Sequence, residues 1–410
     1  MRILVLNCGS SSVKYQLVDT SVNIALAKGM VSRIGMSDAL LNHKPFDRPE
    51  VKISAEILDH IMAIEYVVQT LQDRDHGVIK DKSEIQGVGH RVVHGGEEFS
   101  DSALITADIL SQIRNCVDLA PLHNPHNIKG INAAQRIFPG VPQVAVFDTA
   151  FHQMMPPASY VYGIPYILYK KYGIRRYGFH GTSHYYVAHR AAQLLRKELK
   201  DLLMITCHLG NGASMTAIKD GKSIDTSMGF TPLEGLLMGT RSGDLDPAVI
   251  LYIMGHEELT LNEANTLLNK HGGLQGISGL SSDMKDILEE SERGNKSAKL
   301  ALEIYCYRIR KYIGAYAAAL GGLDVLVFTA GIGENAPAVR KKACKNLEIL
   351  GIKIDEKRNQ EAIKKEAMIS SPKTRVKVLV IPTNEELVIA RDTERIIHEA
   401  QRRKVMHKGV

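Results

Sequence analysis

The chain has 410 residues, of which 44% are hydrophobic and 23% are charged, with 51 Lys and Arg against 45 Asp and Glu. This balance is that of an ordinary globular protein and excludes a disordered or fibrous chain. The length predicts two or three domains rather than a single core.

The net charge and the cysteines limit which partners and which cellular compartment we expect for this chain. The net charge of +6 favours a small anionic substrate, but the chain has no Trp and no basic stripe with interleaved aromatic residues, so we expect no nucleic-acid partner. No apolar run approaches the ~20 residues of a membrane helix, and the start lacks the apolar middle of a signal peptide. The five scattered cysteines contain no C-x-x-C pair, which argues against a disulfide framework or a zinc site. We therefore expect a cytoplasmic protein without a membrane partner.

Three apolar runs each end in a turn of small residues, which predicts a strand followed by a tight loop. They occupy residues 3–6, 203–206 and 325–329, and their loops occupy residues 7–12, 208–212 and 331–335. After the first two loops the sequence alternates between apolar and polar residues, which favours a hairpin, and this repetition indicates two related halves. After the third loop, Pro337 is typical of a helix start.

Four longer segments show apolar residues at helical spacing. They occupy residues 56–71, 183–199, 297–320 and 385–403, and each predicts a helix with one buried face. Because such helices are mixed with strands along the whole chain, the predicted fold class is α/β.

Two of the loops are candidate phosphate sites. A phosphate needs backbone N–H groups at close range and a cation, and the turn at residues 7–12 followed by Lys14 offers both. It is not the standard P-loop, and an ordinary Ser-rich turn is the alternative. The Gly210-Asn211-Gly212 loop is a weaker candidate, because Asn-Gly is also a favoured hairpin turn.

Two other functions must be weighed. The pattern Gly331-x-Gly333-x-x-Ala336 satisfies the loose dinucleotide-binding motif, but the two hairpins do not belong to a dinucleotide unit. The spacing of His180 and His184 could serve a transition metal on a helix, although the glutamate of H-E-x-x-H is missing. We disfavour both.

Four individual residues are candidates for a functional site because of their side-chain chemistry and their sequence context. Arg91 interrupts an apolar strand, so it either forms a buried ion pair or binds a carboxylate or phosphate. Arg241 lies in a glycine-flanked loop and is either a charge-stabilising finger or a surface residue. His180, where a strand-like run meets a helix, is either a polar group at a cleft or a structural histidine. Asp148 ends a strand, where α/β sheets collect their site residues, or it caps a helix.

Carboxylates also follow the apolar run at residues 378–381. Glu385 and Glu386 lie just beyond this expected strand. They suit either a Mg²⁺ ion or the start of the final helix.

In chain order, the segments described above contain the motifs NCGSSSVKYQL, GHRVVHGG, FDTAFH, RRYGFHGTSH, HLGNGAS, GFTPLEGLLMGTRSGDLDP, FTAGIGEN and PTNEEL. Together these motifs resemble the acetate kinase family over essentially the whole chain. The resemblance implies two duplicated α/β domains of the actin, Hsp70 and sugar-kinase fold (ASKHA, ribonuclease H-like), with ATP in an interdomain cleft. The implied domains are residues 1–150 plus 386–410, with a returning C-terminal helix, and residues 151–385, which bind the nucleotide.

The resemblance also implies a reaction and partners. The γ-phosphoryl group of ATP would pass directly, in line and reversibly, to acetate, giving acetyl phosphate and ADP with Mg²⁺ (or Mn²⁺) as cofactor. A carboxylate is already ionised at neutral pH, so the reaction needs no general base. A homodimer is implied as well. A propionate kinase of the same family, or an actin-like or Hsp70-like ATPase, is the alternative.

By motif, the resemblance assigns individual roles. Asn7 and Glu385 would hold the metal, with Glu386 as the alternative to Glu385. The implied catalytic residues are His180, Arg241, Asp148 and Arg91. Arg91 would bind the carboxylate of the substrate, and its methyl group would lie in a pocket of Val93, Leu122, Phe179 and Pro232. The ATP site would contain Lys14, His208, Leu209, Gly210, Asn211, Gly212, Asp283, Met284, Lys285, Gly331, Ile332, Gly333, Glu334 and Asn335. Position 285 departs from the expected Arg, which keeps a cation but loses planar stacking.

Overall fold

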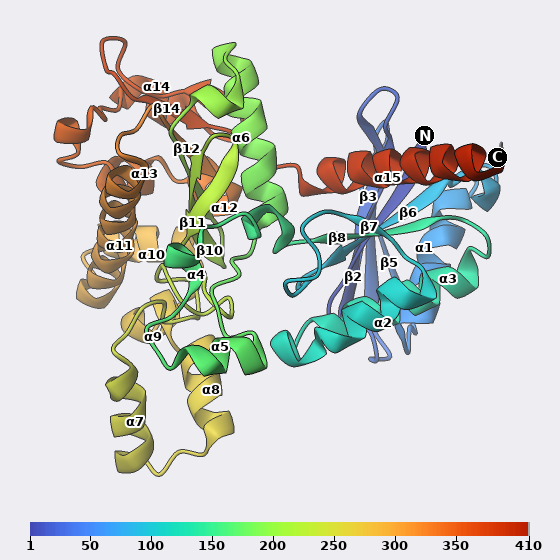
Figure 1. Ribbon diagram of the computed structural model, residues 1–410, viewed down its shortest axis with the longest axis horizontal. Helices are drawn as coiled ribbons and strands as arrows, with labels where there is room; N and C mark the ends of the chain where they lie inside the picture. The colour runs from blue at the N-terminus through green and yellow to red at the C-terminus, as the bar shows by residue number, and fades with distance from the viewer. Residues whose placement is uncertain (409–410) are drawn as a thin grey trace. The chain divides into compact units, whose positions relative to one another are not determined.

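The computed structural model describes residues 1–408 and consists of two compact units. Unit 1 comprises Met1–Ala150 and the chain from Asn384 onward, and unit 2 comprises Phe151–Thr383. Each unit has its own sheet and helices, so the predicted α/β class is confirmed (Figure 1). No helix within residues 1–408 is long and apolar enough to cross a bilayer.

The sheet of unit 1 has the strand order β5-β4-β3-β2-β1-β6-β8-β7. Strands β1 to β5 form an antiparallel series, whereas β1, β6 and β8 run parallel. The strands are β1 (Arg2–Cys8), β2 (Ser12–Asp19), β3 (Ile24–Ser32), β4 (Ala39–Pro45), β5 (Val51–Ala55), β6 (Gly87–Val92), β7 (Ala103–Leu104) and β8 (Gln143–Phe147). The helices are α1 (His60–Gln72), α2 (Ala107–Asn115), α3 (Asn124–Ile137) and α15 (Glu385–Lys408).

Two helical layers cover the central strands of unit 1. Leu4, Leu6 and Cys8 of β1 join a buried cluster that includes residues of α1 and α3. The other face is covered by α15, which approaches closely because β6 has glycines there: a Cβ on Gly89 would collide with Thr393. The close approach positions the first residue of α15, Glu385.

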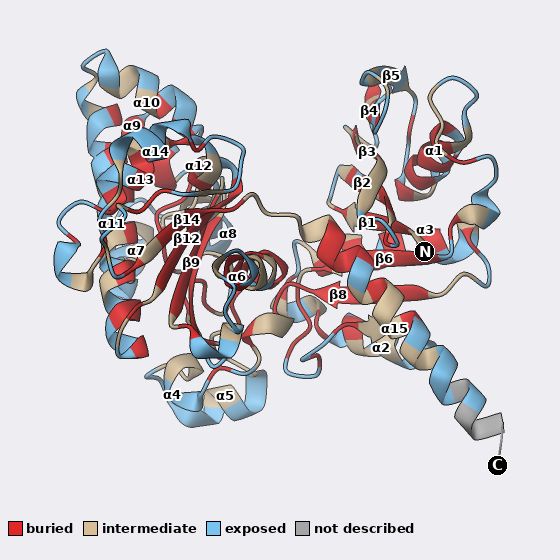
Figure 2. Ribbon diagram, turned by 90° about the horizontal axis from the view of Figure 1, so that it is seen from above, coloured by how far each residue is buried: buried red, intermediate tan, exposed pale blue. Residues whose placement is uncertain are grey.

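The sheet of unit 2 has the order β11-β10-β9-β12-β14-β13. Its strands are β9 (Met204–Leu209), β10 (Ala213–Lys219), β11 (Lys222–Thr226), β12 (Val325–Thr329), β13 (Ala367–Met368) and β14 (Lys377–Val380). Its helices are α4 (Pro157–Tyr160), α5 (Tyr166–Tyr172), α6 (Gly181–Leu195), α7 (Pro247–His256), α8 (Leu261–Lys270), α9 (Gly273–Ser278), α10 (Met284–Glu292), α11 (Lys296–Leu320), α12 (Ala330–Asn335), α13 (Pro337–Ala343) and α14 (Glu356–Glu361). The central strands β9 and β12 are buried along their whole length (Figure 2).

The two sheets repeat one topology. In unit 1 the order β3-β2-β1-β6-β8 has an antiparallel hairpin beside three parallel strands, and β11-β10-β9-β12-β14 repeats it in unit 2. The prediction of two related halves is therefore confirmed. Strand β12 runs parallel to β9 and β14, but the same sheet continues into the antiparallel series β9-β10-β11, which a doubly wound dinucleotide-binding domain does not contain. The fold is therefore not that of a dinucleotide-binding domain.

Most predicted elements are present, with shifted ends. The helix predicted from residue 56 starts at His60, because the Asp59 side chain caps it by accepting from the Met62 amide. The helix predicted over residues 183–199 covers Gly181–Leu195 and ends at Arg196, which has a left-handed φ of 54°. The helix predicted over residues 297–320 is Lys296–Leu320.

Two local predictions are wrong. Residues 331–335 form the short helix α12 rather than a tight loop, and Ala330, with φ of 64°, turns the chain directly from β12 into it. The run before His180 is not a strand, because the chain reaches α6 through an irregular segment.

Buried histidines make the stability of unit 2 depend on pH. His152 is fully buried, and its Nε2 donates to the Phe179 carbonyl while its Nδ1 accepts from the Ser223 hydroxyl. Burial lowers the pKa of His152 to about 4, and burial also lowers the pKa of His184. The unfolded chain binds a proton at each ring below a pH of about 6.5, whereas the folded chain does not. The stability that these two histidines contribute by staying neutral in the folded chain is therefore fully present above this pH, and it is lost as the pH drops toward 4.

We expect His152 to cost about 2 kcal/mol of unfolding free energy at pH 5. Urea unfolding at pH 7.5 and pH 5, followed by circular dichroism, measures the loss. The His152→Gln variant should be less stable at pH 7.5 but should lose less between the two pH values. An equal loss in the variant and the parent protein would refute this account.

Candidate active site

One face of the unit 1 sheet carries four of the predicted site residues. Because Leu4, Leu6 and Cys8 enter the core beside α1 and α3, Asn7 lies on the opposite face, which α15 covers. Lys14 lies directly opposite Asn7 in the β1–β2 pair. These two side chains therefore share the α15 face at the end of β1.

Arg91 and Asp148 belong to the same face. Arg91 follows Gly89 by two residues on β6, and Gly89 packs against α15. Asp148 follows β8, the parallel neighbour of β6. The four residues therefore meet at the carboxyl ends of β1, β6 and β8, where open α/β sheets place their ligands.

Arg91 and Asp148 form a bidentate ion pair. The Arg91 Nε lies 2.9 Å from Asp148 Oδ1, and Nη2 lies 2.6 Å from Oδ2. The Asp148 side chain is 2% exposed and that of Arg91 is 23% exposed. Although burial alone would lower the pKa of Arg91, the charge of Asp148 raises it above the ordinary value. Asp148 therefore does not cap a helix, which was one of its two interpretations. Arg91 forms the buried ion pair that was one of its two.

The pair still leaves Arg91 with donors for a ligand. Asp148 occupies Nε and Nη2, and Nη1 makes no hydrogen bond within residues 1–408. The ion pair and an anion-binding role are therefore compatible.

Glu385 lies among other charges at the start of α15. Its pKa is raised to about 7, chiefly by burial; the charges of Arg91 and Lys14 lower it, and those of Asp148 and Glu386 contribute to the rise. Asn384, rather than either glutamate, caps the helix, because its Oδ1 accepts from the Leu387 amide at 3.1 Å. The glutamates are therefore available for a ligand.

The donor set in this part of unit 1 fits a hard cation. Three carboxylates face two cationic side chains, and all the donors are oxygens, which Mg²⁺ prefers. Within residues 1–408 no group of three or more His, Cys, Asp or Glu side chains has the geometry to hold a metal by itself. Mg²⁺ commonly binds through one or two carboxylates and completes its shell with water and phosphate oxygens, so these two observations agree.

Two side chains donate hydrogen bonds to backbone carbonyls at the turn of residues 7–12. His60 Nε2 donates to the Gly9 carbonyl at 2.7 Å, and Asn127 Nδ2 donates to the Cys8 carbonyl at 2.9 Å. The Ser10 and Ser11 side chains at the tip remain exposed. A rigid turn with an exposed tip suits a phosphate cradle.

Asn127 is a residue that the sequence analysis missed. Besides holding Cys8, its Oδ1 accepts from the Val93 amide at 3.1 Å, so it connects the turn with the segment after Arg91. Its position on the buried face of α3, beside Ile128 and Ile131, is a signal, because a polar residue at a core position must satisfy its hydrogen bonds.

Unit 2 contains a pocket of about 880 Å³ between the β9–β10 hairpin and α10, α12 and residues 363–364. Eight of the predicted ATP-site residues line it: Gly210, Asn211, Asp283, Met284, Lys285, Gly331, Ile332 and Asn335. The sequence analysis missed Ser282, Leu288, Glu289, Glu292, Ala336, Ile363 and Lys364, which complete the lining. A volume of this size suits a small-molecule ligand.

Three other predicted ATP-site residues, Leu209, Gly333 and Glu334, do not line this pocket. Leu209 is fully buried. Gly333 accepts at its carbonyl from Arg340 Nη1 at 2.8 Å, and the Glu334 carboxylate accepts from the Thr383 amide at 3.1 Å. Their role toward a nucleotide stays a prediction.

His180, His208, Gly212 and Arg241 lie close together beside this pocket. The rings of His180 and His208 stack at 4.1 Å between centroids, and His180 Nδ1 lies 2.9 Å from the Ser214 hydroxyl. A Cβ placed on Gly212 would lie 3.4 Å from Arg241 Nη1 and 3.6 Å from His180 Cε1. A glycine is needed here because a side chain would crowd both groups.

Arg241 is a cation without a carboxylate partner within residues 1–408. Its Nη1 donates to the Pro232 carbonyl at 3.3 Å, and burial lowers its pKa. A partly buried guanidinium without a counterion favours an anionic ligand.

The predicted apolar residues lie in different units. In unit 1, Val93 is partly buried and Leu122 is exposed. In unit 2, Phe179 is buried and Pro232 is partly buried. Whether they contact a substrate methyl group stays a prediction.

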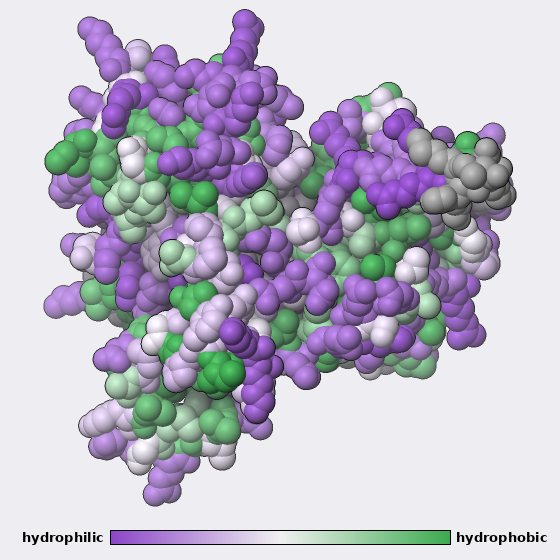
Figure 3. Space-filling view, viewed as in Figure 1, coloured by the Kyte–Doolittle hydropathy of each residue, from purple (hydrophilic) through white to green (hydrophobic). Residues whose placement is uncertain are grey.

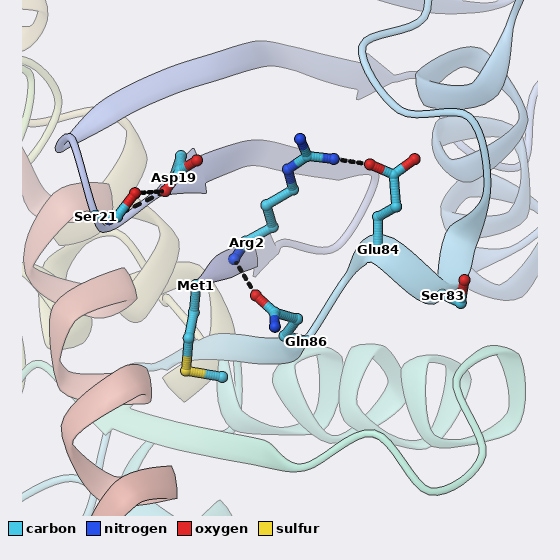
Figure 4. A pocket seen from close by; sticks show the side chains of 7 residues that line it. All are labelled: Met1, Arg2, Asp19, Ser21, Ser83, Glu84 and Gln86. Atoms are coloured by element: carbon cyan, nitrogen blue, oxygen red, sulfur yellow. Dashed lines mark hydrogen bonds and ion pairs between the residues drawn. The ribbon is translucent and has the colours of Figure 1, made fainter.

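A second pocket, of about 410 Å³, lies at the N-terminus of unit 1 (Figure 4). There the Arg2 side chain pairs with Glu84, and the Arg2 amide donates to Gln86. The Ser21 hydroxyl donates to Asp19. Since none of the predicted site residues lines this pocket, it is not a candidate for the reaction.

Comparisons with known proteins agree on one family. The model of the acetokinase family matches residues 2–391. The acetate kinase of Halothermothrix orenii is 57% identical over 397 residues, which are 97% of this chain and 100% of that protein. The crystal structure of Porphyromonas gingivalis acetate kinase matches with a TM-score of 0.94 and 48% identity, over 97% of this chain and 99% of that one. A propionate kinase from Francisella tularensis matches with a TM-score of 0.90 and 45% identity, over 96% and 99% of the two chains. The α/β fold with two related halves that the resemblance implies is confirmed, whereas its domain limits and its ATP cleft stay predictions.

Proposed function

Because this chain belongs to the acetokinase family, we propose that it transfers the γ-phosphoryl group of ATP reversibly to acetate, giving acetyl phosphate and ADP. The observation that carries the proposal is the Arg91 site, where a guanidinium anchored by Asp148 keeps donors for a small carboxylate. We assign binding of the acetate carboxylate to unit 1 and nucleotide binding to the pocket of unit 2.

The chemistry requires positioning and charge neutralisation. A carboxylate oxygen of acetate forms the new P–O bond as the bond to the ADP oxygen breaks, and no proton has to move. We assign orientation of the acetate carboxylate to Arg91 and contact with its methyl group to Val93, Leu122, Phe179 and Pro232. His180 and Arg241 donate to the transferred phosphoryl oxygens as their charge changes, and Asp148 holds Arg91 in place.

One assay tests the function against its alternatives. ADP release is measured with acetate, with propionate and with neither, and hydroxylamine traps an acyl phosphate as the hydroxamate. We expect ADP release that depends on acetate and yields acetohydroxamate. ADP release without any acid would indicate an ATPase instead. A higher kcat/KM for propionate would assign the chain to the propionate kinases, an alternative that the Francisella tularensis match keeps open.

We propose that Asn7 and Glu385 hold Mg²⁺, or Mn²⁺ in its place, together with nucleotide phosphates. When bound, the ion would neutralise phosphate charge during transfer. The partly buried Glu385 carboxylate, whose pKa is raised to about 7, supports the assignment because a cation would stabilise its ionised form.

Removal of this ligand gives a test that does not depend on turnover. The Glu385→Gln variant should bind Mn²⁺, titrated by electron paramagnetic resonance in the presence of ADP, at least roughly 10-fold more weakly than the parent protein. Glu386→Gln is the matched control and should change the Mn²⁺ affinity less. Equal affinities in the parent protein and the Glu385→Gln variant would exclude Glu385 as the ligand.

We also propose that the chain forms a homodimer through α7 and α8. No residue of α7 is buried although its sequence is largely apolar, and Leu251 and Tyr252 are 70% and 64% exposed. Apolar side chains gather over this end of unit 2, where Figure 1 places α7 and α8 (Figure 3). Exposed apolar patches of this kind mark interfaces.

A single charge should separate the two copies. In sedimentation velocity we expect the parent protein to be a dimer and the Leu251→Asp variant to be a monomer, because a buried unpaired carboxylate is costly. Ile349, which is 91% exposed outside these helices, provides the control: Ile349→Asp should remain dimeric. A dimeric Leu251→Asp variant would rule out this surface.

We propose a cytoplasmic location on the chemistry of the cysteines. All five thiols are free and buried, which suits a reducing compartment. Fractionation of the source cells, followed by detection of the chain, tests this.

A further inference from the structure

The loop that carries Arg241 is closed at its base. We call residues 235–244 the Arg241 loop. The Gly235 amide donates to Asp244 Oδ1 at 2.8 Å, and the Asp244 amide donates back to the Gly235 carbonyl at 2.9 Å. The side chain and the backbone of Asp244 therefore fasten both ends of the loop to each other.

Asp244 is also attached to the longest helix of unit 2. The Tyr312 hydroxyl donates to Asp244 Oδ2 at 2.8 Å, and Arg308 Nη2 donates to the Asp244 carbonyl at 3.0 Å. Both residues belong to α11, whose inward residues Ile309 and Ile313 are fully buried. The base of the loop is thus fixed to a rigid part of the core.

Within the loop, backbone hydrogen bonds fix the position of Arg241 relative to the base of the loop. The Met238 amide donates to the Arg241 carbonyl at 3.1 Å, and the Gly239 amide donates to the Asn211 carbonyl at 2.9 Å. Gly243, with φ of 69°, is packed so closely that a Cβ would collide with the Leu236 carbonyl. The loop is therefore compact, and only two residues separate Arg241 from Asp244.

The guanidinium itself is held weakly. Within residues 1–408 it forms no ion pair, and its hydrogen-bond contacts are to the Pro232 carbonyl at 3.3 Å and the Met238 sulfur at 3.9 Å. Its placement before a ligand binds therefore depends on the loop.

We propose that Asp244, held by Tyr312 and Arg308, is a positioning residue that places Arg241 for phosphoryl transfer. This inference rests on the proposed role of Arg241 at the transferred phosphoryl group. A misplacement of about 1 Å can cost roughly 100-fold in rate. The loss of one hydrogen bond at the base of the loop should cause a smaller loss of rate than this.

The test is a double-mutant cycle on kcat. Tyr312→Phe removes one hydroxyl and should lower kcat about 10-fold, with the KM for ATP and for acetate within two-fold of the parent protein. In an Arg241→Ala background the same substitution should lower kcat no further, because its effect passes through Arg241. Tyr316→Phe is the matched control: this hydroxyl on the same helix is buried and has no hydrogen-bond partner within residues 1–408, so kcat should not change.

Asp244→Asn gives a second measurement. Asp244 accepts from two donors through two oxygens, whereas Asn offers one oxygen, so kcat should again fall while ADP affinity, measured by calorimetry, is kept. An unchanged kcat in Tyr312→Phe, or a loss that is additive with Arg241→Ala, would overturn the positioning role. If Arg241→Ala itself leaves kcat unchanged, the proposed role of Arg241 fails first, and the inference fails with it.

Discussion

Replacement of Arg241 by alanine is expected to lower kcat by roughly 10³- to 10⁵-fold, the range measured for arginine fingers. The structure favours an effect on the transition state rather than on binding. Arg241 lacks a carboxylate partner within residues 1–408 and lies beside His180 at the 210–212 hairpin, at the edge of the pocket rather than in its lining. ADP affinity should therefore stay within a few-fold of the parent protein.

Steady-state kinetics for both substrates and calorimetric titration with ADP measure the two quantities separately. Arg241→Lys keeps the charge but not the planar fork, so its kcat should lie between those of the parent protein and Arg241→Ala. A parallel loss of kcat and ADP affinity would mean that Arg241 belongs to the nucleotide pocket itself. A kcat close to that of the parent protein would remove Arg241 from the reaction.

The duplicated topology could be predicted because its signals are local. A β-rich run, a turn of small residues and renewed alternation occur at residues 3–18 and again at residues 203–218, and each of these patterns predicts a hairpin. These patterns can be recognised from neighbouring residues alone, without knowledge of contacts to residues far away in the sequence. The long helix at Lys296–Leu320 is equally explicit, since Asn295 caps its start and Gly321 ends it in the left-handed region.

The segment at residues 331–335 shows where local signals fail. Two glycines and an asparagine have poor helix propensity, which favours a loop. In the structure Gly333 packs against the backbone of β12 and β9, and this contact stabilises the helical turn of α12. Tertiary packing therefore overrides propensity at a site that lines the pocket.

The side-chain partners of the site could not be derived from the sequence for a different reason. Asp148 lies 57 residues from Arg91, and Tyr312 lies 68 residues from Asp244. Pairs at such separations depend on strand order and helix packing. The sequence therefore left Arg91 with two interpretations, and only the fold showed that the two are compatible.

Replacement of Arg91 by alanine should have the second large effect, and it should have two components. The loss of the guanidinium donors that Asp148 leaves free should raise the KM for acetate at least roughly 100-fold and lower kcat, since charge-assisted hydrogen bonds to the carboxylate are lost. The loss of the ion pair leaves Asp148, 2% exposed, without its partner. A buried carboxylate that loses its partner costs about 3–5 kcal/mol, so the thermal midpoint of unit 1 should fall by roughly 6–20 °C.

The two components separate in the Arg91→Ala/Asp148→Ala double variant. Removal of both charges takes away the unpaired carboxylate, so the thermal midpoint should recover most of the loss. The KM for acetate should not recover, because no guanidinium is present to bind the substrate. Differential scanning calorimetry and kinetics on the same preparations test both statements. If the double variant regained acetate affinity together with stability, Arg91 would be a structural residue, and the acetate site would have to lie elsewhere.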